Sequence, residues 1–375
     1  MAETTFTPGG LSMPTKESSH ASPPSIWGLA PLCATPLRWV TGWLFFSAFW
    51  RRVILVPGKL DPNSSDYVGH EFVKFLPHAL GIKPFLAAAL AHEGMLHAFM
   101  VLFTGIEGLV GLALLLGLGT RLAAFGAINL SLGILLGSGW LGSTCLDEWQ
   151  IGVLGIAAGT MLVMTGSGPW GLDTFLQDRF PNRYLASKAW VRWLSSGSLN
   201  AVEPPRWFRN AALVLALGIL ALTLATNQIF YGGVWGKLHN DSKSPHFALS
   251  NAQISDTGSV RLTLYRDGGP DTYGAFLSTI RVRNASNEIV ENFDSVVLKA
   301  LPPGALKNEY ALKLHPGPYG LVAPLGSKAT LDLIPSAPKI LPQGTYSLEV
   351  EDVSGLKWVT PLRVAEITGR LMNQG

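Results

Sequence analysis

The sequence predicts a membrane-embedded bundle of five transmembrane helices followed by an external all-β sandwich. Three observations support this fold class. Hydrophobic residues make up 48% of the chain and charged residues only 14%, whereas an ordinary soluble domain has roughly 25% charged residues. Apolar runs long enough to cross a bilayer of ~30 Å recur along the first 230 residues. After Lys237 the pattern changes to short runs in which apolar and polar residues alternate, which is typical of strands.

The order of these patterns divides the chain into five segments. The first is rich in Ser, Thr, Pro and Gly and has no basic region leading into an apolar one, so it predicts a disordered tail and not a signal peptide. The predicted segments are this tail (1–36), a four-helix membrane domain (37–169), a basic cytoplasmic connection (170–209), a fifth transmembrane helix (210–231) and the β-sandwich (232–375).

Each membrane helix is predicted from its own apolar run. The first run is LRWVTGWLFFSAFWRRVILV, residues 37–56, and the next three cover residues 95–118, 122–139 and 149–165. The last run, residues 211–230, is flanked by aromatic residues on both sides, as expected where a helix crosses the two membrane surfaces.

Basic residues set the predicted orientation, because Lys and Arg near helix ends stay on the cytoplasmic side. The connection 170–209 carries six of them against three acids, whereas the loop SGWLGSTCLDE carries two acids and no base. The N-terminus is therefore expected inside and the sandwich outside, in the periplasm. The connection after the first helix disagrees with this rule, because it would be external and yet contains Arg51, Arg52, Lys59, Lys74 and Lys83.

About seven alternating segments follow Lys237, a number that suits a sandwich of ~100 residues. In LPQGTYSLEVED, Tyr346 is placed to hydrogen-bond back to the nearby backbone, as in the corner of such domains. Arg281 and Arg283 share one face of a strand and could add positive charge over the membrane unit, although a solvated sheet face is the simpler interpretation.

Composition excludes several classes of function. The net charge is only +3, and no run of Lys and Arg is dense enough to follow a nucleic-acid backbone. The two cysteines, Cys33 and Cys145, form no C-x-x-C pair for zinc or C-x-x-C-H motif for haem, and HEGMLH is not the zinc motif H-E-x-x-H. We therefore expect no metal site, and the sequence identifies no bound cofactor. The lipid bilayer is an expected partner, and homo-oligomerisation is left open.

Two groups of motifs carry a resemblance to a known family. LRWVTGWLFFSAFWRR (37–52), KLDPNS (59–64) and GSTCLDEWQIG (142–152) resemble the four-helix DoxD subunit of thiosulfate:quinone oxidoreductase. RLTLYRDGGPDTYGAFLSTIRVRN (261–284) and HPGPYGLVAPLGSKATLDL (315–333) resemble its small DoxA subunit. The resemblance implies a fusion of both subunits in a bacterial or archaeal cytoplasmic membrane. It also implies oxidation of thiosulfate to tetrathionate on the outer face, with membrane quinone accepting two electrons.

Arg51 and Arg52 are candidates for binding thiosulfate, which is a dianion. They lie roughly 8 Å before the end of the first apolar run, and charged side chains at such depth are usually paired or functional. Arginine also matches oxyanions with two parallel hydrogen bonds. The alternative is that both side chains extend to the lipid headgroups.

Cys145 is a candidate nucleophile, because it lies in the short external loop on the same side as the arginine pair. A covalent adduct would store one oxidised half of the reaction while the second thiosulfate arrives. Asp147 and Glu148 would raise the thiol pKa and repel the substrate, and a packed, unreactive cysteine is the alternative.

Three residues are candidates for quinone binding or proton transfer. Glu107 is the only carboxylate inside the second helix, and an acid at that depth is functional by default. The alternative is a structural pair with Arg38 or Asn129. His97 lies near the start of the same helix and changes charge near neutral pH, and Trp149 could stack on a quinone ring.

These candidates give a four-step hypothesis. Arg51 and Arg52 hold thiosulfate, Cys145 takes its sulfane sulfur, a second thiosulfate releases tetrathionate, and quinone near Glu107 and His97 accepts two electrons. Two other classes of function are compatible with the sequence: a non-catalytic assembly or sensor protein whose sandwich binds a partner, and an anion transporter.

Overall fold

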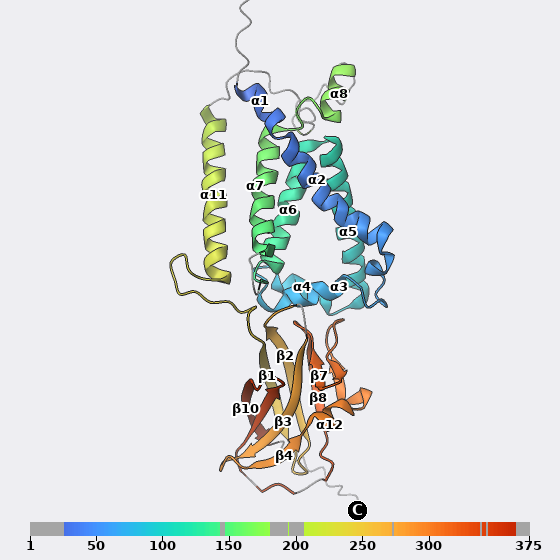
Figure 1. The fold of residues 1–375 in the computed structure, drawn as a ribbon, viewed down its shortest axis with the longest axis vertical. Coiled ribbons are helices and arrows are strands. Elements are labelled where there is room, and N and C mark those ends of the chain that lie inside the picture. The colour runs from blue at the N-terminus through green and yellow to red at the C-terminus, as the bar shows by residue number, and fades with distance from the viewer. Residues whose placement is uncertain are drawn as a thin grey trace, which may run out of the picture.

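A computed structural model describes residues 26–142, 147–180, 194, 206–271, 274–337, 340–342 and 344–364. A helical unit and a β-domain follow one another along the longest axis of the molecule, with a thin layer of short helices between them (Figure 1). The chain enters the β-domain from a helix, α11, that stands at the edge of the helical unit. The predicted order of a helical unit followed by an all-β domain is therefore confirmed.

Four helices among the described residues are long and apolar enough to cross a membrane. They are α5 (Glu93–Leu116), α6 (Thr120–Ser138), α7 (Asp147–Thr165) and α11 (Arg206–Phe230). The first predicted span is shorter in the structure. Helix α2 (Thr35–Trp50) has 16 residues, and five further residues, Arg51–Leu55, form a π-helical turn, η1. The first predicted span, at α2, is therefore not confirmed by length, and four of the five predicted spans meet the length criterion.

Two short helices lie at the end of the helical unit that is far from the β-domain (Figure 1). They are α1 (Ile26–Cys33) and α8 (Leu172–Arg179). Helix α1 occupies part of the segment predicted as a disordered tail, because its sequence IWGLAPLC is apolar enough to continue α2 backwards beyond Pro36. Between residues 181 and 205 the structure describes Leu194 alone, and this residue adds nothing to the fold.

Glycines let the helices of the bundle approach closely, as small residues commonly do in membranes. A Cβ atom added to Gly42 of α2 would lie 2.8 Å from the Leu115 nitrogen of α5, and one added to Gly111 would lie 2.7 Å from the Gly42 carbonyl oxygen. Helices α6 and α7 meet in the same way, because a Cβ on Gly159 would lie 2.6 Å from Ile128 Cγ1. These contacts fix which faces of α2 and α5 meet.

Arg38 and Asp173 close the far end of the bundle. The Arg38 guanidinium is fully buried and donates to the carbonyl oxygens of Leu114 (2.6 Å), Leu115 (3.1 Å) and Trp170 (3.1 Å). The Asp173 carboxylate accepts from the backbone N–H groups of Gly119 and Thr120 at 2.7 and 3.0 Å. Helix ends leave such groups without partners, so the pair stabilises the turn between α5 and α6.

Short helices form the layer between the bundle and the β-domain (Figure 1). They are η2 (Pro57–Leu60), α3 (Gly69–Phe75), η3 (Leu76–His78) and α4 (Lys83–Leu90). Polar contacts fasten the β-domain to this end of the helical unit. His78 Nε2 lies 2.7 Å from the Asp267 carbonyl oxygen, Asn240 Nδ2 donates to the Gly142 carbonyl at 2.9 Å, and the Tyr231 hydroxyl donates to the Gly139 carbonyl at 2.9 Å.

The β-domain is one nearly closed sheet around a single apolar core. Its strands are β1 (His246–Ile254), β2 (Val260–Gly268), β3 (Ala275–Asn284), β4 (Ile289–Phe293), β5 (Leu306–Asn308), β6 (His315–Gly317), β7 (Gly320–Ala323), β8 (Lys328–Leu333), β9 (Tyr346–Asp352) and β10 (Lys357–Val364). The order is β5-β8-β2-β1-β10-β9-β3-β7-β6, with β4 beside β3. All pairs are antiparallel except β1 with β10, which joins the two halves of the sandwich.

Six of the seven expected segments are strands, and the seventh, SVVLKAL at residues 295–301, forms a short helix instead. Four further strands bring the number among the described residues to ten, and they were missed because they have only three to five residues and no clear alternation. A short helix, α12 (Ser295–Lys299), and a 3-10 turn, η4 (Pro303–Ala305), connect β4 to β5. The predicted tyrosine corner is confirmed, since the Tyr346 hydroxyl donates to the Pro342 carbonyl oxygen at 2.5 Å.

Candidate site on the α5 face

Arg52 and Glu107 form a buried ion pair between η1 and α5. Their side chains are 17% and 6% exposed, and the Thr104 hydroxyl lies 3.5 Å from Arg52 Nη1. The Arg52 guanidinium also lies 5.9 Å from the centre of the Phe103 ring. A carboxylate inside an apolar helix requires such a partner. The structure therefore joins two residues for which the sequence suggested separate roles.

Neither Arg38 nor Asn129, the two alternative partners considered for Glu107, pairs with it. Arg38 binds the carbonyl oxygens at the opposite end of α5, and the Asn129 side chain donates to the Phe125 carbonyl oxygen of its own helix at 2.8 Å. The alternative of a structural pair with a neighbouring helix therefore applies to Arg52 and not to these two residues, a choice that depends on the rotation of one helix against another, which a sequence does not give.

The polar residues of α5 lie on one face of the helix. Glu93, His97, Thr104 and Glu107 follow one another at intervals of three, four or seven residues, which places them in one stripe. The stripe faces α2, because Gly108 and Gly111 continue it against Phe49 and Phe46. Ten residues separate His97 from Glu107, about 15 Å along the axis, so one quinone ring cannot touch both.

His97 is half-buried, and its Nδ1 atom is buried without a hydrogen-bond partner among the described residues. The sequence placed His97 at an edge of the apolar run, and the structure places it in the first turns of α5, at the end nearest the β-domain.

Aromatic rings surround this end of the stripe. The Phe72 ring lies 5.4 Å from the Phe99 ring and 5.8 Å from the Phe103 ring, and Phe85 lies 5.6 Å from Phe99. The sequence reasoning missed this cluster. Its signal was the i, i+4 spacing of Phe99 and Phe103 together with the aromatic residues of the preceding connection.

Trp149 lies on the opposite side of the bundle and has a structural partner. Its indole N–H donates to the Thr226 hydroxyl of α11 at 3.0 Å. Trp149 is not brought to the Arg52–Glu107 pair, and its contact holds α11 against α7.

Cys145 lies outside the described residues. The described residues that flank its segment, Gly142 and Asp147, are at the β-domain end of α6 and α7. Cys33 is exposed in α1 at the other end of the bundle.

The basic residues of the connection after α2 differ in whether their side chains have partners within the protein. Lys74 is paired with Glu71 at 2.8 Å, and Lys83 donates to the Pro77 carbonyl oxygen at 2.7 Å. The Arg51 side chain is exposed, whereas that of Arg52 is half-buried. Arg51 is therefore the member of the arginine pair that could meet an anion without first breaking the contact to Glu107.

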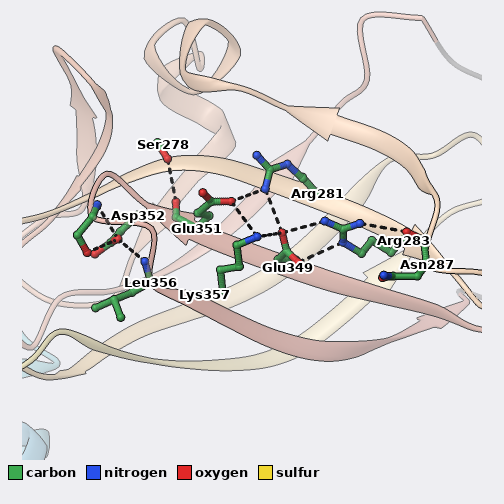
Figure 2. A network of polar contacts seen from close by, with 10 residues as sticks. Ser278, Arg281, Arg283, Asn287, Glu349, Glu351, Asp352, Leu356 and Lys357 are labelled. Atoms are coloured by element: carbon green, nitrogen blue, oxygen red, sulfur yellow. Dashed lines mark hydrogen bonds and ion pairs between the residues drawn. The ribbon is translucent and has the colours of Figure 1, made fainter.

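Arg281 and Arg283 add no free positive charge over the membrane unit. Both bind Glu349, Arg281 also binds Glu351, and Lys357 completes the network (Figure 2). Hydrogen bonds from Arg283, and then from Arg281 and Lys357, lower the pKa of the Glu349 carboxyl to about 2, although its partial burial acts in the opposite direction. The network is a stabilising feature of the sheet.

No group of three or more His, Cys, Asp or Glu side chains in the described part of the chain could hold a metal ion. The candidate site therefore consists of the ion pair, the polar stripe of α5 and the aromatic cluster.

Two family models match the chain in succession. Residues 33–200 match the family described as TQO small subunit DoxD, and residues 230–360 match the family described as TQO small subunit DoxA, where TQO is thiosulfate:quinone oxidoreductase. The chain is a fusion of a DoxD unit and a DoxA unit. The resemblance drawn from the sequence motifs is thereby confirmed.

The DoxD unit contains the helices from α2 to α8 and so holds the whole candidate site of α5. The DoxA unit begins at the last residue of α11 and contains the β-domain up to β10. The rest of α11 lies between the two matches. The DoxD–DoxA fusion thus has α5, α6 and α7 in the DoxD unit, α11 almost entirely between the two units, and the docked β-domain in the DoxA unit.

Proposed function

We propose that the DoxD–DoxA fusion oxidises thiosulfate to tetrathionate and passes the electrons to membrane quinone. Two thiosulfate ions each lose one electron and become joined by a new S–S bond, and the quinone takes up two electrons and two protons. The observation that carries the proposal is the presence of both matches on one chain, each to a family described as a small subunit of this oxidoreductase.

The buried pair supports a quinone reaction in the DoxD unit. Quinone reduction needs protons inside an apolar environment, and a carboxyl held in that environment can supply them. Glu107 is the proton-transfer residue of this proposal, and Arg52 holds the carboxyl in place. His97 lies nearer to the β-domain on the same face of α5.

Thiosulfate is proposed to react on the side of the bundle that carries the DoxA unit. Arg51, which is exposed, binds the dianion. The Cys145 thiolate forms an S–S bond to the sulfane sulfur, and two electrons leave for the quinone. A second thiosulfate then attacks that sulfur, so that tetrathionate leaves and the thiolate is restored. The asymmetry of basic residues in the sequence supports placing this side outside the cytoplasm.

The test uses the full chain purified in detergent, with thiosulfate and a soluble quinone. We expect quinone reduction at two thiosulfates consumed per quinone, with tetrathionate as product. Glu107→Gln should lower the turnover at least 100-fold, the lower range for loss of a general acid, whereas Glu288→Gln on the exposed β3–β4 turn should change nothing. Folded protein that reduces no quinone over a range of pH values would refute the proposal.

The variant Cys145→Ser tests the covalent cysteine step separately from the overall oxidation of thiosulfate. Loss of turnover with unchanged quinone binding is expected if Cys145 carries the sulfur. Unchanged turnover would exclude the covalent step, and thiosulfate oxidation by the fusion would then proceed without it.

A further inference from the structure

Two buried polar atoms at the β-domain end of the helical unit lack hydrogen-bond partners among the described residues. They are the Tyr67 hydroxyl oxygen and His97 Nδ1. Tyr67, which precedes α3, is 3% exposed. Buried hydroxyl and imidazole groups are almost always hydrogen-bonded, so each of these two groups is free to hydrogen-bond to a molecule from outside the chain.

The two groups are connected through the first turns of α5. The Tyr67 ring packs in an apolar cluster with Leu96 and Met100 of α5, the residues that flank His97 on its own helix. The carboxylate of Glu93, one turn before His97, is close enough to act on the phenol. Burial first, and then Glu93, raise the pKa of Tyr67, so the hydroxyl keeps its proton and can donate it.

The surroundings suit a flat apolar ring. Phe72, Phe99 and Phe103 contribute their rings to the cluster. The Tyr67 ring lies over Gly69, where an added Cβ would be 2.6 Å from Cζ. A single buried water that bridged these two groups would have two polar partners from them, fewer than the three that buried waters typically have.

The DoxA unit covers the cluster from outside. Tyr310, Ala311 and Leu312, in the loop between β5 and β6, pack against the same apolar residues. The layer is therefore bounded by α5 of the DoxD unit on one side and by a loop of the DoxA unit on the other.

We infer that Tyr67 and His97 bind the headgroup of the quinone, with one carbonyl oxygen accepting from the Tyr67 hydroxyl and the other facing His97 Nδ1. The inference rests on the proposed function and makes it more specific, because it adds Tyr67 and the DoxA loop to the quinone site. Glu107 is then a proton source for this site and not a ligand of the ring, since it lies about three helical turns from His97.

The test measures binding without thiosulfate, so that it does not depend on turnover. Decylubiquinone is titrated into the purified full chain by calorimetry, and the thermal melting of each variant is recorded without quinone. Tyr67→Phe removes one hydroxyl and should raise the dissociation constant roughly 2- to 10-fold, the range for one hydrogen bond. Thr120→Val is the control, because it removes another unpaired buried hydroxyl, at the start of α6 and far from the β-domain.

The outcomes separate this inference from the proposed function. Weaker binding by Tyr67→Phe alone, with melting no lower than that of the wild type, supports the headgroup site. Equal affinity of Tyr67→Phe and the wild type overturns the inference and leaves the proposed function intact. A wild-type protein that binds no decylubiquinone overturns the proposed function itself. If Tyr67→Phe does not fold, His97→Leu is titrated instead, and unchanged affinity there overturns the inference.

Discussion

The Arg52–Glu107 pair predicts a specific pattern of stability. Arg52→Met removes the partner of a carboxylate that is only 6% exposed, and leaving one buried charge unpaired costs about 3–5 kcal/mol. Glu107→Leu strands the guanidinium in the same way, although Arg52 is more exposed and should cost less. In the double variant no buried charge is left, and its free energy of unfolding should fall within about 1 kcal/mol of the wild type or exceed it.

The assay is unfolding of the full chain in mixed micelles with a rising fraction of denaturing detergent, followed by helical circular dichroism. The difference between the double variant and the sum of the single variants gives the coupling energy of the pair. A coupling energy near zero would refute the pairing. A double variant that is as stable as the wild type but reduces no quinone would show that the charges serve catalysis. Full turnover in that variant would assign the pair to structure alone.

Three further predictions concern the scaffold. Glu349→Gln should destabilise the β-domain by about 1–2 kcal/mol at neutral pH, allowing for solvent screening. Because the pKa of Glu349 in the folded protein is lowered to about 2, this difference in stability should shrink as the pH falls below the ordinary carboxyl range and vanish near pH 2. Melting temperatures of both proteins, measured against pH, test this. A difference in melting temperature that does not change with pH would show that the network carries no stability. Gly111→Leu should lower the free energy of unfolding by about 1–3 kcal/mol, because the new side chain forces α5 away from α2. Gly105→Ala, whose Cβ meets open space, should raise it by about 0.5–1 kcal/mol. Equal effects of the two variants on unfolding in detergent would contradict the close contact of α2 with α5. Thr226→Val should lower stability by about 0.5–1.5 kcal/mol through loss of the Trp149 contact and leave the KM for quinone unchanged, and a raised KM would return Trp149 to the quinone site.

Much of the helical unit could be predicted because the length of an apolar run reflects the thickness of a membrane. The run 95–118 became α5 at Glu93–Leu116, and 211–230 became the apolar part of α11. The same criterion counted residues 37–56 as one regular helix. The structure has a π-helical turn at Arg51–Leu55 instead, and a change in hydrogen-bond pattern within an apolar run leaves no trace in composition.

The candidate site could be predicted in its members but not in its pairing. The cost of burying a charge in a membrane was enough to single out Glu107 and the arginine pair as candidates. That Glu107 pairs with Arg52 and not with Arg38 depends on which faces of α2 and α5 meet at Gly42 and Gly111. The Tyr67 hydroxyl could not have been found from the sequence. Nothing in the residues around it indicates that the ring is buried, because the short helices that bury it lack a long apolar period.

The contacts that dock the β-domain have a consequence for how the two units came to share a chain. Gly142 with Asn240, His78 with Asp267 and Tyr231 with Gly139 join the helical unit to residues at or beyond the end of α11. These contacts do not need a peptide link through residues 181–205. Two polypeptides divided there would already recognise each other, and the covalent link would act by raising the effective concentration of one unit near the other. Fusion would then fix a one-to-one stoichiometry and synthesis in equal amounts, without creating the interface.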